Sequence, residues 1–205
     1  MINNIDSILD LLEFSSEDDF YHLQILKRKK ENPHIGSNSY VVKTYYVSSF
    51  EYLQSMMDEI IHLCNYHNAR ACINLNRRSY EKIAYHTLKK VTDQIMNKDF
   101  KSARKAYESV CGAFSNEKDK KWIIDIDHKD FEFDNDELRD EFYNEVMSKI
   151  HELIKETGKD DTLHIIKTKN GFHIVSRPFD ILKFKDIYGD TIDIHKDNPT
   201  ILYIP

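Results

Sequence analysis

Two aspartates stand two positions apart at the end of an apolar stretch, in WIIDIDHKD (residues 122–130). The stretch is typical of a strand, in which side chains two apart point to one face, so Asp125 and Asp127 lie opposite Ile124. Two carboxylates on one face repel each other unless a cation lies between them, and paired hard oxygen ligands suit Mg²⁺ or Mn²⁺. The alternative is a strand end that enters water with both acids solvated.

A histidine lies in a second segment, KTKNGFHIVSRPFD (residues 167–180). Two β-type runs flank Asn170 and Gly171, which predicts a hairpin with a type I′ turn, because both central residues of that turn need positive φ. Four side chains of this hairpin are able to bind phosphate: Lys167, Lys169, His173 and Arg177. A half-buried structural histidine with exposed lysines is the alternative.

A third carboxylate stands between two isoleucines near the end of the chain, in TIDIH (residues 191–195). Asp193 on a neighbouring strand would complete a two-metal site, which needs several anionic ligands. Asp197 competes with Asp193 for this position, and an edge-strand acid is the alternative. Earlier in the chain, Arg77 and Arg78 follow a predicted strand and are candidates for contacts with a template or a triphosphate; surface guanidinium groups are the alternative.

Composition limits the function classes. The 205 residues carry a net charge of -6, and the split is uneven: residues 1–118 hold 16 basic and 15 acidic residues, and residues 119–205 hold 13 basic and 20 acidic residues. An acidic half argues against a passive nucleic-acid coat and suits a site that gathers carboxylates around divalent cations. No apolar run approaches the roughly 20 residues that span a bilayer.

Targeting signals and cysteines indicate a cytoplasmic protein. The N-terminus, MINNIDSILDLLEF, lacks the basic region of a secretory signal. The three cysteines, Cys64, Cys72 and Cys111, show no paired spacing, so we expect buried free thiols in a reducing compartment. We expect a cytoplasmic location and no membrane partner.

The pattern of elements predicts an α/β (α+β) chain with a single mixed β-sheet flanked by helices. Residues 1–36 are predicted as an N-terminal helical extension, with one helix over 5–14 and another, capped by Ser16, over 17–30. Residues 37–205 are predicted as the catalytic domain. Its strands cover 39–49, 70–76, 120–127, the hairpin, 191–195 and 200–205, and its helices cover 50–68, 79–97, 100–114, 137–157 and 179–189.

The order of the three acidic and histidine motifs resembles that of the archaeo-eukaryotic primase superfamily, the primase-polymerases. That family has DxD or DxE, then SxH or GxH, then a hydrophobic residue followed by Asp. Here G-x-H ends 46 positions after Asp127, and Asp193 follows 20 positions after His173. NPTILY (198–203) is similar to the strand after the third motif, and ACINLNRRS (71–79) to an early family strand, so the resemblance spans roughly residues 69–205.

The resemblance implies a DNA primase or primase-polymerase, a metal-dependent nucleotidyltransferase of phage or mobile-element replication. Asp125, Asp127 and Asp193 would be the catalytic ligands of two Mg²⁺ or Mn²⁺ ions. The nucleotide-binding residues would be His173, Lys169, Arg177 and Gly171. Partners would be nucleoside triphosphates, a single-stranded template and a replicative helicase. Gly171 replaces a serine found in many members, and neither a zinc knuckle nor a helicase domain accompanies the motifs.

Two other functions remain open from the residues. Asp125, Asp127 and Lys129 form D-x-D-x-K, close to the acid-x-Lys arrangement of metal-dependent nucleases, although this leaves His173 and Asp193 without a role. A catalytically inert primase-like module that acts by protein contact is the second alternative.

Overall fold

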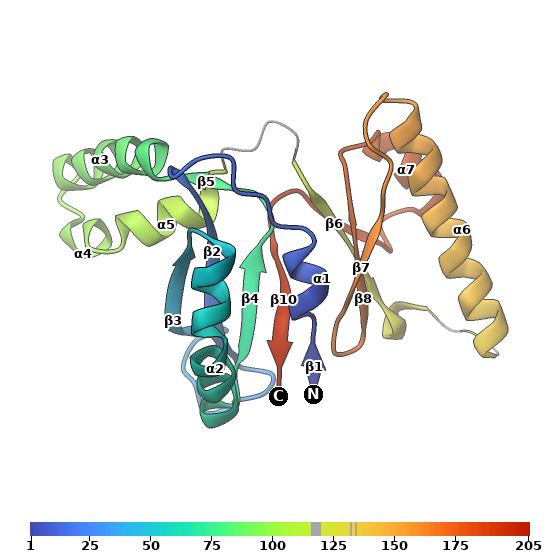
Figure 1. Ribbon diagram of the computed structural model, residues 1–205, viewed down its shortest axis with the longest axis horizontal. Coiled ribbons are helices and arrows are strands. Elements are labelled where there is room, and N and C mark those ends of the chain that lie inside the picture. The colour runs from blue at the N-terminus through green and yellow to red at the C-terminus, as the bar shows by residue number, and fades with distance from the viewer. Residues whose placement is uncertain (116–119, 132, 134) are drawn as a thin grey trace.

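The computed structural model describes residues 1–115, 120–131, 133 and 135–205, and these form an α+β fold with two antiparallel sheets (Figure 1). The larger sheet has the order β1 (Ile2–Asn3), β10 (Pro199–Ile204), β4 (Arg70–Asn74), β2 (Asp19–Arg28) and β3 (Ser39–Val47), with β5 (Arg78–Ser79) paired to β2. The smaller sheet has the order β7 (His164–Lys167), β8 (Gly171–Ser176), β6 (Trp122–Asp127) and β9 (Asp193–His195).

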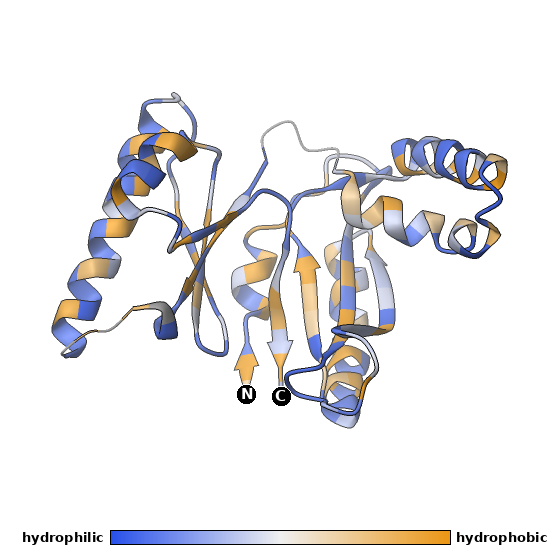
Figure 2. Ribbon diagram, turned by 180° about the vertical axis from the view of Figure 1, so that it is seen from behind, coloured by the Kyte–Doolittle hydropathy of each residue, from blue (hydrophilic) through white to orange (hydrophobic). Residues whose placement is uncertain are grey.

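Helices flank both sheets, and α6 and α7 lie on the side of the smaller sheet that faces away from the larger one (Figure 1). The described helices are α1 (Ile5–Leu9), α2 (Phe50–His67), α3 (Tyr80–Met96), α4 (Phe100–Ala103), α5 (Ala106–Ala113), α6 (Asp136–Lys155) and α7 (Ile181–Tyr188). Ser49 and Asn135 cap α2 and α6 by accepting hydrogen bonds from backbone N–H groups three positions on, as their side chains predict. Along α6, apolar and polar bands alternate, as expected for an amphipathic helix packed on one face of a sheet (Figure 2).

The prediction of one mixed sheet is wrong, because among the described strands every pairing is antiparallel. The helix α2 connects β3 to β4, but β4 pairs with β2 on the side away from β3. Strands β3 and β4 are both antiparallel to β2 and so run parallel to each other, but β2 lies between them, so the crossover through α2 produces no parallel pair.

The predicted helix over residues 17–30 is also wrong, since Asp19–Arg28 form strand β2. This strand lies between β3 and β4, and both of its faces are covered. Tyr21 and Leu23 belong to the core beneath α2, whereas Phe20 packs in a cluster with Ile83 and Val110 of α3 and α5. Acids at one end and bases at the other favour a helix locally, but pairing on both edges and burial on both faces decide the structure. Residues 1–36 thus contribute two strands, β1 and β2, to the larger sheet, and only α1 of this range is an α-helix.

Two hydrophobic cores position the cleft. One lies between the smaller sheet and α6 and α7, and contains Ile124 and Ile126, so these side chains face away from the two aspartates as expected. The other lies under α1 and α2, and it includes Ile166 and Val175 of the smaller sheet together with Leu202 of β10. This shared core joins the two sheets.

The three cysteines are buried free thiols, as predicted. Within the described part of the chain, we find no helix with both the length and the apolar character required to cross a bilayer.

Candidate active site between the two sheets

A cleft of about 740 Å³ lies between the sheets and receives side chains from both. The larger sheet and its β2–β3 connection contribute Arg28, Lys30, Glu31, Arg70 and Cys72. The smaller sheet contributes Asp125, Asp127, Lys169, His173 and His195. A mostly cationic wall therefore faces a wall that carries the two predicted acids.

The strand register brings the three predicted motifs into one row. β6 lies between β8 and β9, and its Asp125 is the direct cross-strand partner of His173 on β8 and of Asp193 on β9. Direct partners in an antiparallel pair point to the same face, so the three side chains share the face of the sheet that Asp127 also occupies. Asp193 is exposed and lies outside the set of residues that line the cleft.

His173 is held by both of its ring nitrogens. Its Nε2 lies 3.4 Å from Oδ1 of Asp125, and its Nδ1 lies 2.8 Å from Oγ1 of Thr200. The ring is 12% exposed, and Thr200 is fully buried on β10 of the larger sheet. Its orientation thus depends on both sheets. Sequence reasoning did not single out Thr200, although the NPTILY strand that carries it was recognised.

The environment of Asp125 favours its ionised form. Burial raises the pKa of this carboxyl, but the hydrogen bond and charge of His173, with the charges of His195 and Lys129, outweigh burial and hold the pKa below its ordinary value of 3.8. The carboxylate of Asp127 forms an ion pair with Lys129, with 3.0 Å between Oδ2 and Nζ. Asp125 is therefore available as an anionic ligand at neutral pH.

The chemistry of this donor set fits a hard divalent cation, since two carboxylates share a face and a third lies in register beside them. Across the residues that the structure describes, however, no group of three or more His, Cys, Asp or Glu side chains is arranged to hold a metal ion. The two-metal site stays a prediction. Asp125 and Asp127 share one face of β6, and Asp193 lies beside Asp125 on the neighbouring strand.

The hairpin that carries His173 forms, but the predicted type I′ turn at Asn170 and Gly171 is wrong. Neither residue has a positive φ, and a hydrogen bond from Thr168 N–H to Gly171 O, at 2.9 Å, closes the turn around Lys169 and Asn170. Gly171 is required for another reason: a Cβ added there would lie 1.8 Å from the backbone oxygen of Ile126. The strands β6 and β8 approach too closely at this point for any side chain, including serine.

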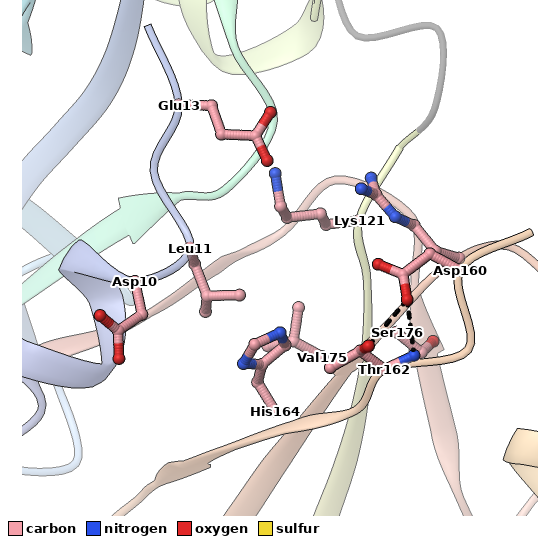
Figure 3. A pocket seen from close by; sticks show the side chains of 10 residues that line it. Asp10, Leu11, Glu13, Lys121, Asp160, Thr162, His164, Val175 and Ser176 are labelled. Atoms are coloured by element: carbon pink, nitrogen blue, oxygen red, sulfur yellow. Dashed lines mark hydrogen bonds between the residues drawn. The ribbon is translucent and has the colours of Figure 1, made fainter.

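The structure separates the four predicted phosphate-binding side chains. Lys169 and His173 line the cleft, whereas Lys167 does not. Arg177 lines a different cavity of about 80 Å³ at the other end of β8, together with Asp160, whose Oδ1 accepts hydrogen bonds from Thr162 (Figure 3). Arg177 therefore does not join His173 in the cleft, because four positions of extended chain, about 13 Å, separate the two residues.

Arg77 and Arg78 are neither surface guanidinium groups nor residues that line the cleft. Arg78 is fully buried, and its guanidinium donates to the backbone oxygen of Cys111 and to both carboxylate oxygens of Asp197, at 3.2 and 3.1 Å. Arg77 forms an ion pair with Asp19 at 3.5 Å. Asp197 is thus engaged in a structural pair, which leaves Asp193 as the candidate that shares the face of Asp125.

The cationic wall of the cleft was missed from the sequence. Arg28 and Lys30 belong to the LKRKK run (26–30), which was interpreted as the basic end of a helix, and Arg70 opens β4. The run of basic residues over 27–30 was visible in the sequence as a possible phosphate-binding segment. Its position opposite β6 depends on how the two sheets pack, which no local pattern encodes.

The chain matches no protein-family model, no curated protein and no solved structure in the three comparisons made.

Proposed function

We propose that this chain is a metal-dependent nucleotidyltransferase of the primase-polymerase kind, which makes or extends nucleic-acid primers on a single-stranded template. The observation that carries the proposal is the row of Asp193, Asp125 and His173 across β9, β6 and β8, with Asp127 on the same face. These are the residues that the motif order assigns to the catalytic metals and the incoming nucleotide. The phage or mobile-element setting and a helicase partner rest on the resemblance alone.

The site is able to hold the reactants in size and charge. A volume of about 740 Å³ is within the range of small-ligand sites and accommodates a nucleotide. Lys169 on one wall, and Arg28 and Arg70 on the other, offer N–H donors for charge-assisted hydrogen bonds to a triphosphate. A polymerase site needs this pairing of cations for phosphate with acids for metal.

Asp125 and Asp127 would hold Mg²⁺ or Mn²⁺, with Asp193 as the neighbouring acid. When bound, such ions lower the pKa of an attacking hydroxyl and neutralise charge on the transferred phosphate. The chain itself supplies the orientation: β6 presents both carboxylates from a rigid inner strand, and Thr200 holds the imidazole of His173 next to Asp125. Rigid elements of this type position a site more accurately than loops.

Primer extension on a labelled primer–template tests the proposal. With Mn²⁺ or Mg²⁺ and nucleoside triphosphates, we expect wild-type extension, and a loss of at least about 10²-fold for Asp125→Asn and for Asp127→Asn. Asp58→Asn, on the exposed side of α2, is the matched control and should keep full activity. Extension that persists in both active-site variants would contradict the assignment.

A nuclease is the second candidate, because Lys129 lies within 3.0 Å of Asp127 as the D-x-D-x-K arrangement requires. The same labelled DNA, incubated with Mg²⁺ and no nucleotides, distinguishes the two: cleavage that Lys129→Ala abolishes identifies a nuclease. An inert module would show neither reaction, and its melting temperature would not rise with Mn²⁺ or nucleotide.

A further inference from the structure

One carboxylate of the cleft contacts cations from both sheets. Glu31, in the connection between β2 and β3, is hydrogen-bonded and ion-paired to the guanidinium of Arg70 on β4. The same oxygen, Oε1, lies 3.8 Å from Nζ of Lys169 at the tip of the β7–β8 hairpin. The side chain of Glu31 is only 15% exposed, so this contact is not a loose surface pair.

The backbone around Glu31 is anchored. The side-chain amide of Asn68 donates to the backbone oxygen of Glu31 at 3.2 Å, and Asn68 ends α2 in the left-handed region, with φ of 47°. The buried amide of Asn32 donates in turn to the backbone oxygens of Asn68 and Arg28, at 3.0 and 3.3 Å. The carboxylate is thus presented to the cleft from a fixed point.

Glu31 and Lys169 also separate two cavities. Both line the main cleft, and both line a second cavity of about 310 Å³ beside the two chain ends, Met1 and Pro205. A ligand that extends from one cavity into the other would have to pass this ion pair.

We infer that Arg70 and Lys169 form a phosphate-binding site of the cleft, and that Glu31 occupies it in the free protein as an internal competitor. A phosphate group is an anion with several acceptor oxygens, and it satisfies the same N–H donors that the carboxylate now uses. Glu31 must give way when a polyphosphate enters. The inference rests on the proposed function for the natural ligand, a nucleoside triphosphate, but the site itself recognises phosphate.

Calorimetric titration with inorganic tripolyphosphate, in EDTA and without template, tests the inference directly. Glu31→Gln keeps the size of the side chain and removes its charge, and we expect it to bind tripolyphosphate about tenfold more tightly than wild type, since hydrogen bonds between charged groups are the stronger ones. Glu59→Gln, which removes an equivalent carboxylate paired with Lys43 outside the cleft, should bind as wild type does. Equal or weaker binding by Glu31→Gln overturns the inference.

A second variant guards against a folding artefact. Lys169 is 58% exposed, so Lys169→Ala should leave the melting temperature unchanged and weaken tripolyphosphate binding; unchanged binding would also overturn the inference. Because the titration needs neither metal nor catalysis, its result is separable from primer extension. Tighter binding by Glu31→Gln in a chain that extends no primer supports the phosphate site and refutes the polymerase.

Discussion

Replacing Gly171 by alanine perturbs the point where the GxH hairpin meets the strand of the two aspartates. The new Cβ would lie 1.8 Å from the oxygen of Ile126 and 2.9 Å from its carbonyl carbon. Both atoms are backbone, so no side chain is able to rotate away. The strands β6 and β8 must separate by more than an ångström locally, at the step where Gly171 pairs with Asp127.

The expected cost follows from two contributions. Overpacking a well-packed site costs about 1–3 kcal/mol, and each backbone hydrogen bond weakened at the end of the ladder adds about 1 kcal/mol. A total of about 3 kcal/mol lowers the melting temperature of a chain of this size by about 6–12 °C. Thermal and urea unfolding, followed by circular dichroism, measure both quantities.

Gly112→Ala is the matched control, because Gly112 lies inside α5 and an added Cβ there meets nothing within 4 Å. Alanine should stabilise this helix by up to about 1 kcal/mol. If Gly171→Ala melts within about 2 °C of wild type while Gly112→Ala behaves as expected, the close approach of the strands does not constrain this position, and the reason given for a glycine in the GxH motif is refuted.

Three further outcomes follow from the buried charges. The folded state holds the pKa of Asp125 below 3.8 and so favours its ionised form; urea unfolding should show that wild type loses stability more steeply than Asp125→Asn as pH falls from about 5 to 3. Burial, together with the charge of Arg78, lowers the pKa of His22 to about 4, so folding disfavours protonation of this side chain. The free energy of unfolding of wild type should therefore fall by up to about 3 kcal/mol between about pH 6.5 and 4, whereas that of His22→Gln should not. Arg78→Met leaves Asp197 without its buried partner and should cost about 3–5 kcal/mol in urea unfolding; a cost below about 1 kcal/mol would show that the pair is dispensable.

Features that depend on neighbours in sequence were predictable. The alternation around Asp125 placed both aspartates on one face and the isoleucines on the other, and the burial of Ile124 and Ile126 agrees. The helix predicted from residue 50 begins there as α2, where the side chain of Ser49 accepts the capping hydrogen bond. The face of a strand residue follows from the two-residue alternation of side chains, and the start of a helix follows from one hydrogen bond to a residue two or three positions on.

Features that depend on residues far away in the sequence were not predictable. The segment that forms β2 has helix-like charges at its ends, and only its pairing with β3 and β4 makes it a strand. Arg78 looked like a surface or ligand-binding residue because its partner, Asp197, lies 119 positions away. The turn of the hairpin lies one residue before its predicted place because Gly171 is already paired with Asp127 as the first residue of β8.

The candidate site combines both kinds of information. The acids of β6 follow from local sequence, but the cations that face them come from a different sheet, and the two sheets meet through a core that Val175 and Leu202 share. The hydrogen bond between His173 and Thr200 crosses the same junction. Any change that shifts one sheet against the other therefore alters the orientation of the imidazole and the spacing between the phosphate-binding and acidic walls together. For this reason we expect substitutions in the shared core to affect ligand binding more than their distance from the cleft suggests.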